Sequence, residues 1–406
     1  TTLINAFFAM GIFMLFRLYF KDREIFPFWL MIITSFPFLF HSTTIFPEIP
    51  AAMMTLFIFI FGFTRYKNYL LAGLFLAFLP WFHVKHYPVV MVFSLALLFK
   101  IFNEWKGDRN PASIIKFLVF PGFSLILLML YCKVLYGTIN PALIFPKQNY
   151  FVDYFLKIKV FFAYFLDQKD GLLTYGPFLF LLFFGLKRKF DYRYLLLFAA
   201  GIYVTLHAFT TVRGAYAPAG RPLVFVLWIF LLFTAQVYFS SDSRHSLGRY
   251  IFRFLMGLSY FFTLWFFYYP FFMFQPVFSA TKNRASDLFN FLSSDSIYLP
   301  SLLPSFITHP DGTHLPNLLW IPGLFLLMLF FYLRKGDLFS FEIRNKKVIT
   351  AAMLMIFSVL TYLFASYPHV QLDQRNRFLI DSIPIYKTAK LFHYIEDIEK
   401  GHHSIK

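Results

Sequence analysis

The sequence predicts an all-α membrane protein, a polytopic transmembrane helix bundle of about twelve spans. The chain of 406 residues is 59% hydrophobic and only 14% charged, whereas soluble domains carry about 25% charged residues. Its apolar residues fall into separate runs, each long enough or nearly long enough to cross a bilayer. Every second loop between these runs is basic, as in membrane proteins with a fixed orientation.

Each predicted span is an apolar run that ends at a polar or basic loop. The fourth run is short for a span, and long polar stretches follow the sixth and the tenth. In chain order the runs cover residues 3–20, 25–40, 49–63, 69–82, 88–102, 114–131, 172–186, 194–209, 223–239, 250–268, 318–333 and 348–365.

Charge distribution orients this bundle, which covers residues 1–365 and includes two long loops, 136–170 and 270–316. The positive-inside rule assigns the basic loops to the cytoplasm. The long loops and a polar tail, 366–406, then lie outside a multi-pass protein of the cell membrane (inner or plasma membrane). The basic loops contain Lys21 and Arg23, Arg65 and Lys67, Lys106 and Arg109, 187–189, Arg244 and Arg249, and 334–347.

The chain start and the overall charge allow two further predictions. An extracytoplasmic N-terminus with neither an initiator methionine nor a basic leader indicates that another span precedes Thr1. The net charge of +17 is carried mainly by short loops, which suits an anionic membrane surface and argues against nucleic acid as a partner. The single Cys132 excludes an internal disulfide and a cysteine metal cluster.

Glu48 is an acidic side chain at the predicted outer boundary, between Pro47 and Pro50. Charge is costly at the edge of a membrane, so such a residue is a candidate for function. A helix N-terminus also favours a carboxylate, and Pro50 would fit its first turn.

His83, Lys85 and His86 form a polar cluster on the predicted outer side, where the charge rule disfavours lysine. Together they could bind phosphate. The alternative is an interfacial anchor in which Trp81 and Tyr87 form an aromatic belt. The two histidines as metal ligands are a weaker interpretation, because no carboxylate partner is evident.

Arg213 and Arg221 lie in one short outer loop of small residues without an acid. Two arginines in such a loop suit a phosphate clamp, although a simple turn with interfacial arginines has the same composition. Asp167 precedes the seventh run, where it could bind a sugar or a cation. Helix capping explains Asp167 almost as well.

Several stretches, in the same order along the chain, resemble the GT-C superfamily of membrane glycosyltransferases. The similarity is to the branch of protein mannosyltransferases and the aminoarabinose transferase of lipid A, and to a bacterial group within it. It covers most of residues 3–221, and no single motif is strongly specific. The stretches are 3–6, 42–52, 79–87, 167–168 with 171–173 and 176–177, and 220–222.

The resemblance implies a large outer loop before Leu3 with an acidic residue that acts as the catalytic base, and this chain does not contain that loop. It also implies that Glu48 is the second acidic position, near a donor phosphate, the acceptor or a divalent ion. The sequence assigns no metal ligands. The cofactor is therefore unknown, and a divalent cation is one candidate. Glu48 is the best candidate base present, and it gathers with Arg221 at the outer edge of the bundle.

The predicted function is transfer of a sugar from a polyprenyl-phosphate donor to a glycan, lipid or protein acceptor on the extracytoplasmic side. A nucleotide sugar is a poor donor because the polar loops face away from the cytosol. An enzyme like an O-antigen ligase or polymerase is a second reading, using Arg284, His309 and His314. A transporter is a third, which span centres almost free of charge disfavour. Walker, dinucleotide, HExxH and GxSxG motifs are absent from the sequence.

Overall fold

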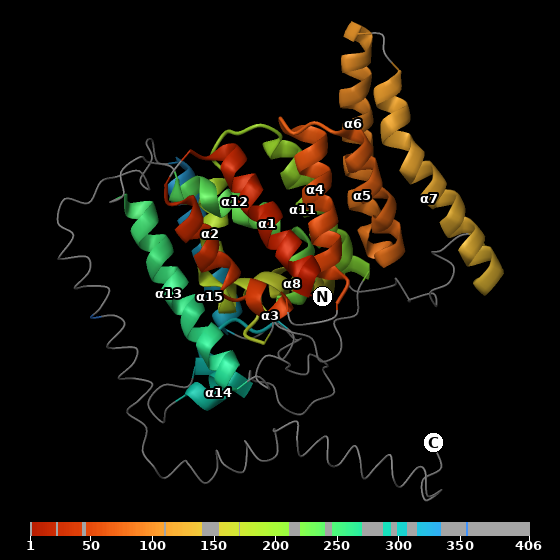
Figure 1. The fold of residues 1–406 in the computed structure, drawn as a ribbon. Coiled ribbons are helices and arrows are strands. Elements are labelled where there is room, and N and C mark those ends of the chain that lie inside the picture. The colour runs from red at the N-terminus through yellow and green to blue at the C-terminus, as the bar shows by residue number, and fades with distance from the viewer. Residues whose placement is uncertain are drawn as a thin grey trace, which may run out of the picture.

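The protein forms a bundle of helices (Figure 1). Every regular element in the described part of the computed structural model is a helix, so the all-α class is confirmed there. The described residues are 2–21, 23–42, 46–108, 111–139, 154–169, 171–210, 220–239, 246–269, 287–293, 299–306, 315–333 and 355.

Five helical segments in this part are long and apolar enough to cross a membrane. Three of them are single helices: α1 (Thr2–Tyr19), α7 (Ala112–Tyr136) and α13 (Leu247–Tyr268). The other two each join a 3₁₀ helix to an α-helix. Val84–Lys106 joins η1 (Val84–His86) to α6 (Tyr87–Asp108), and Arg221–Tyr238 joins η4 (Arg221–Val226) to α12 (Leu227–Tyr238). Shorter apolar helices are α4 (Glu48–Phe63), α5 (Tyr69–Phe82), α11 (Arg193–Thr210) and part of α15 (Leu315–Leu333). These helices are compatible with a membrane protein.

Two of the predicted spans are not continuous helices. The run 25–40 divides into α2 (Ile25–Ile33) and α3 (Phe38–Ser42), with Pro37 between them. The run 172–186 divides into α9 (Leu172–Tyr175), η3 (Pro177–Phe180) and α10 (Leu181–Gly185) after Gly176. Proline lacks the amide hydrogen that would continue a helix, so both breaks coincide with a proline.

The described residues of the predicted long loops form three short helices. They are α8 (Tyr154–Leu166), α14 (Asp287–Leu292) and η6 (Leu299–Ser301). Most of the remaining loop residues, nearly all of the run 348–365 and the tail 366–406 lie outside the described residues.

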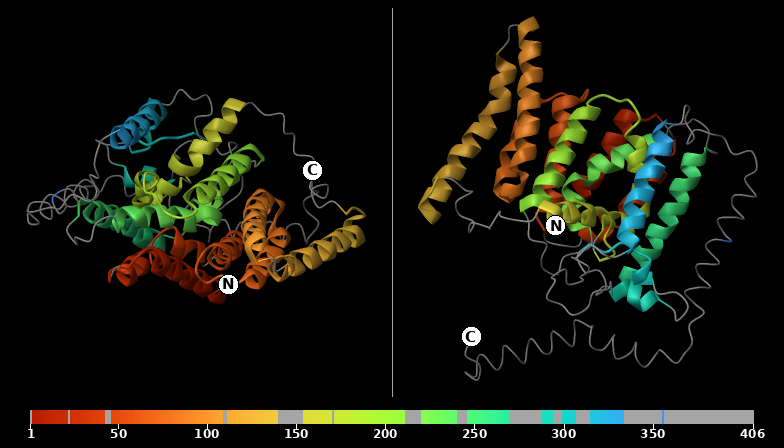
Figure 2. Two further views of the ribbon diagram at one scale, coloured as in Figure 1. Left: turned by 90° about the horizontal axis from the view of Figure 1, so that it is seen from above. Right: turned by 180° about the vertical axis from the view of Figure 1, so that it is seen from behind.

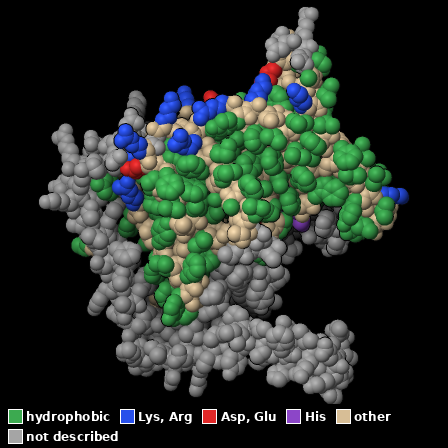
Figure 3. Space-filling view, in the orientation of Figure 1, with side chains coloured by type: hydrophobic (Ala, Val, Ile, Leu, Met, Phe, Trp, Pro, Cys, Tyr) green, Lys and Arg blue, Asp and Glu red, His purple; other side chains and the backbone are tan. Residues whose placement is uncertain are grey.

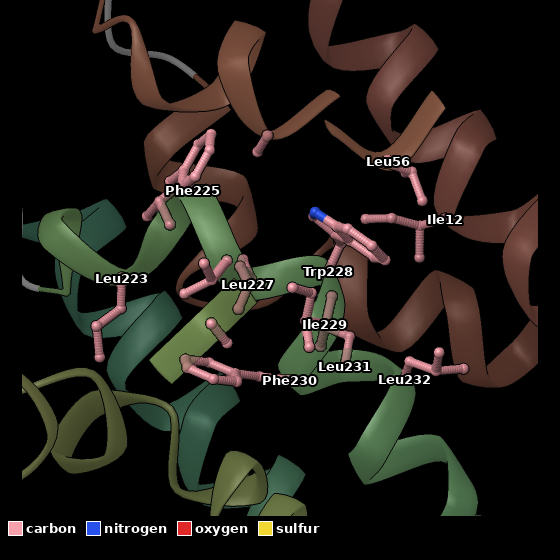
Figure 4. Packing of buried hydrophobic residues seen from close by; sticks show 14 of the residues in the cluster. Ile12, Leu56, Leu223, Phe225, Leu227, Trp228, Ile229, Phe230, Leu231 and Leu232 are labelled. Atoms are coloured by element: carbon pink, nitrogen blue, oxygen red, sulfur yellow. The ribbon is translucent and has the colours of Figure 1, made fainter. Parts of the chain in front are cut away.

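The continuous segment formed by η4 and α12 lies at the centre of the bundle. Its side chains point in all directions into neighbouring helices (Figure 4), and nearly all of them are buried. Trp228 packs beside Ile12 and Leu56 in this view, and its indole N–H donates to Thr55 Oγ1 at 3.0 Å. The position of Arg221 is therefore set by the best-packed segment of the fold.

The helices α5, α6 and α7 lie together along one side of the bundle (Figures 1 and 2). Close approach of α5 to α7 requires Gly73, because a Cβ there would meet the carbonyl oxygen of Phe117 at 2.2 Å. The opposite face of α7 exposes large apolar side chains, including Val134 at 79%. An apolar helix face of this length, left uncovered by protein, suits contact with lipid.

Lys and Arg side chains gather along one end of the bundle, the upper edge in Figure 3. Contacts at this end include an ion pair of 2.6 Å between Lys67 and Glu104. Arg253, near the start of α13, pairs there with Glu24 at 3.0 Å. The basic loops that the structure describes thus share one end, as the alternation in the sequence predicts.

Single cysteines at positions 66 and 139 should be labelled from opposite sides of the membrane in a Cys132→Ser background. Tyr66 is 45% exposed at the basic end, and Ile139 is 54% exposed beyond the other end of α7. A membrane-impermeant maleimide on intact cells should label only position 139, and permeabilised cells should give both. Labelling of both positions in intact cells would contradict this orientation.

Candidate functional site

Three charged side chains from distant parts of the chain meet at the end of the bundle opposite the basic loops. Glu48 Oε1 accepts from Lys85 Nζ at 2.6 Å and from Arg221 Nε at 3.1 Å. The Glu48 side chain is 2% exposed, whereas those of Lys85 and Arg221 are 13% and 26% exposed. We call these three residues the charged triad.

Helix α4 holds Glu48 in a fixed position. Pro47 precedes the helix, and Glu48 lies in its first turn, where the helix dipole favours a carboxylate. Most of the α4 residues that follow are buried, which leaves the helix no freedom to turn Glu48 toward solvent.

The turn between α5 and α6 supplies Lys85. His83 ends α5 in an extended conformation, and its Nδ1 accepts the backbone N–H of Lys85 at 3.1 Å. This bond forms the short helix η1 and directs Lys85 toward Glu48. His83 therefore contributes to the site through its backbone partner.

Arg221 begins the central segment directly after Gly220. Gly220 has φ +74°, and a Cβ there would meet Leu172 Cδ1 at 2.8 Å, so glycine is required for both reasons. The guanidinium of Arg221 lies 3.7 Å from the ring centre of Phe46. The ring of Phe46 covers one face of the guanidinium, and Glu48 accepts a hydrogen bond from its Nε. Together these contacts fix the plane of the guanidinium.

The pairing changes the role expected for Glu48. One carboxylate and two cations give the triad a formal charge of +1, so it can accept a further anion. A carboxylate that is already paired with two cations is a poorer proton acceptor than a free one. The geometry therefore favours Glu48 as the group that orients Lys85 and Arg221, in place of the predicted general base.

His83 is uncharged at neutral pH. Partial burial, followed by the nearby Lys85 ammonium, lowers the pKa of its imidazole below the usual value. Above that lowered pKa the ring is neutral, so His83 adds no positive charge to the triad at physiological pH.

His86 does not belong to an exposed phosphate site as the sequence predicts. Its ring is completely buried and lies 4.3 Å from the ring of Phe225 and 6.1 Å from that of Tyr203. In the 3₁₀ turn, Lys85 and His86 point in different directions, so only the lysine reaches Glu48. Sequence spacing alone cannot show this separation.

The Asp167 carboxylate binds two backbone amides, and neither of them lies in the first turn of a helix, so this contact is not helix capping. Binding of a sugar or a cation by Asp167 stays a prediction. Asp167 Oδ1 accepts from the Lys169 amide at 2.9 Å and its Oδ2 from the Phe306 amide at 2.7 Å. The residue is fully buried and joins the end of α8 to the segment 299–306. Arg213, the other predicted phosphate ligand, lies outside the described residues, as do Arg284, His309 and His314.

Residues that the sequence did not indicate also surround the triad. Nothing in the sequence distinguishes Phe46 from the other phenylalanines of a chain that has 63. Tyr203 and His207 lie four residues apart on α11, and His207 Nδ1 bonds to the Tyr164 hydroxyl at 2.8 Å. The spacing of two polar residues on one face of an apolar helix could have identified them.

Metal coordination finds little support in the described ranges, which contain no group of three or more His, Cys, Asp or Glu residues placed to hold an ion. The carboxylate nearest to such a role, Glu48, is already paired with two cations.

No family model, no curated protein and no solved structure matches this chain. The site is therefore interpreted from its own geometry.

Replacing Glu48 with alanine should destabilise the protein by about 3–5 kcal/mol, because it leaves two partly buried cations unpaired. The matched control is Lys67→Ala, which removes a 47% exposed lysine from its pair with Glu104 and should cost about 0–1 kcal/mol. Thermal unfolding of both variants in the same detergent measures the difference. Equal melting temperatures would show that the triad does not stabilise the fold.

Proposed function

We propose that this protein is a membrane glycosyltransferase of GT-C type that takes a sugar from a polyprenyl-phosphate donor on the extracytoplasmic side of the cell membrane. The charged triad is the observation that carries the proposal. It joins α4, η1 and η4 around one partly accessible site with a charge of +1. A phosphodiester carries a charge of −1 and matches it.

The triad suits a phosphate leaving group. In the transfer, an acceptor hydroxyl oxygen bonds to the anomeric carbon while the bond from that carbon to the phosphate oxygen breaks. The polyprenyl phosphate leaves with the electron pair, and the hydroxyl proton passes to a basic group. Fixed cations in a site shielded from water stabilise the charge that develops on the phosphate. Lys85 and Arg221 are held in place before substrate binds, so they need no reorganisation.

Position in the bundle supports a lipid-linked donor. The triad lies at the end away from the basic loops, which the positive-inside rule assigns to the cytoplasm. Apolar helix faces are exposed near it, including that of α6, where Met91 is 62% exposed. A polyprenyl chain can lie along such a face while its phosphate meets Lys85 and Arg221.

Transport is the other class of function to weigh. A transporter requires ionisable groups near the middle of its spans and interrupted helices in paired repeats. The triad instead lies at helix ends. This placement favours an enzyme that works at the membrane boundary.

Arg221→Ala should weaken binding of a C15 polyprenyl monophosphate by roughly 10- to 100-fold, since it removes a charged hydrogen bond to the phosphate. The measurement is calorimetric titration of the purified protein in nanodiscs. Arg65→Ala, which removes an exposed arginine at the opposite end, should bind like the unmodified protein. Unchanged binding by the Arg221 variant would remove the basis of the proposal.

A further inference from the structure

Beside the charged triad lie four buried polar atoms that have no hydrogen-bond partner among the described residues. They are Glu48 Oε2, both ring nitrogens of His86, and the Tyr203 hydroxyl. Buried polar atoms of folded proteins are nearly always paired, because an unpaired one keeps its full desolvation cost. Several unpaired atoms in one place therefore point to a ligand that pairs with them.

Packing brings the rings that carry three of these atoms together. The His86 and Tyr203 rings are nearly parallel, 11° apart, with centres separated by 6.1 Å. Phe225 contacts both, with ring centres at 4.3 Å and 4.5 Å. The segment η4, which carries Phe225 and Arg221, contacts both α4 and α11, and α11 contacts η1. We call His86, Tyr203 and Phe225 the neutral wall of the site, and Glu48 Oε2 is the charged acceptor next to it.

The chemistry of the neutral wall differs from that of the triad. A neutral imidazole supplies one donor and one acceptor, a phenol supplies both, and the carboxylate oxygen accepts. The aromatic faces supply apolar surface. A phosphate would be repelled by Glu48 Oε2, whereas a sugar has hydroxyls that donate and accept and C–H faces that pack on aromatic rings.

A buried tyrosine close to Tyr203 does have a hydrogen-bond partner. The neighbouring His207, whose ring centre is 5.6 Å from that of Tyr203, already bonds to Tyr164 at 2.8 Å. Tyr203 and His86 are 1% and 0% exposed, so a sugar reaches them only when neighbouring uncharged side chains move aside.

We propose that the neutral wall binds the hydroxyl groups of the sugar while Lys85 and Arg221 bind its phosphate. This inference rests on the proposed function and names the part of the donor that Lys85 and Arg221 do not bind. Tyr203 donates to a sugar oxygen, and Glu48 Oε2 accepts from a sugar hydroxyl.

Tyr203→Phe tests the inference, because it removes one oxygen and keeps the ring. Binding is measured for a C15 polyprenyl phosphate, bare and carrying glucose, galactose, mannose or N-acetylglucosamine. Unmodified protein should bind at least one glycosylated form more tightly than the bare lipid. The variant should lose roughly three- to tenfold of that added affinity and bind the bare lipid unchanged.

Thermal unfolding without ligand provides an independent readout. Removing an unpaired hydroxyl should raise the melting temperature of Tyr203→Phe. The matched control is Tyr175→Phe, equally buried, whose hydroxyl donates to the Gln168 carbonyl oxygen at 2.5 Å. That variant should melt at a lower temperature and keep the sugar preference.

Three outcomes would overturn the inference. Bare and glycosylated lipids binding equally to unmodified protein would leave the phosphate site in place and remove the sugar site. A lower melting temperature for Tyr203→Phe, or an equal loss of affinity for bare and glycosylated lipids, would assign Tyr203 a structural role. Failure of every lipid to bind would overturn the proposed function as well.

Discussion

A buried carboxylate at the start of α4 is the constraint on which this end of the structure depends. Glu48 is 2% exposed, and an isolated charge at such a position costs several kcal/mol. The cost is offset only if cations reach it, and those come from two other segments, η1 and η4. Each of these segments has a local feature that delivers its cation: the His83 bond to the Lys85 amide, and Gly220 with φ +74° before Arg221. Packing of the central helix and placement of the charges are thus coupled.

Much of this arrangement is encoded in patterns visible along the chain. Apolar runs predicted most of the helices, and alternating basic loops predicted which ends lie together. Glu48 and Arg221 were predicted as neighbours because both were assigned to the outer boundary, Glu48 as a charge that is costly there and Arg221 as a cation that the positive-inside rule disfavours on that side. The divided runs 25–40 and 172–186 escaped prediction because apolar composition outweighed the signals of Pro37 and Pro177.

Finer features depended on geometry that spacing does not report. Three polar residues within 83–86 form one cluster in the sequence, yet the 3₁₀ turn directs Lys85 to Glu48 and His86 into an aromatic core. The sequence offers helix capping or ligand binding as roles for Asp167, whereas its carboxylate binds the amide of Phe306, 139 residues away. Phe46 and Tyr203 are recognised only by their contacts with side chains from distant parts of the chain, which a local sequence pattern does not show. The proposed function therefore rests on charge balance: a site with a charge of +1, partly exposed, at one end of a bundle with exposed apolar helix faces.

The central claim is that Glu48 gathers Lys85 and Arg221 onto one carboxylate oxygen. An electron cryomicroscopy structure of the protein in nanodiscs tests it most directly, because it measures the distances from that carboxylate to both cations. The account predicts that both nitrogen atoms lie within hydrogen-bond distance of the same carboxylate, at the end remote from Lys67 and Glu104. Density that places Arg221 away from Glu48, or opens the two residues onto opposite membrane surfaces, would contradict it.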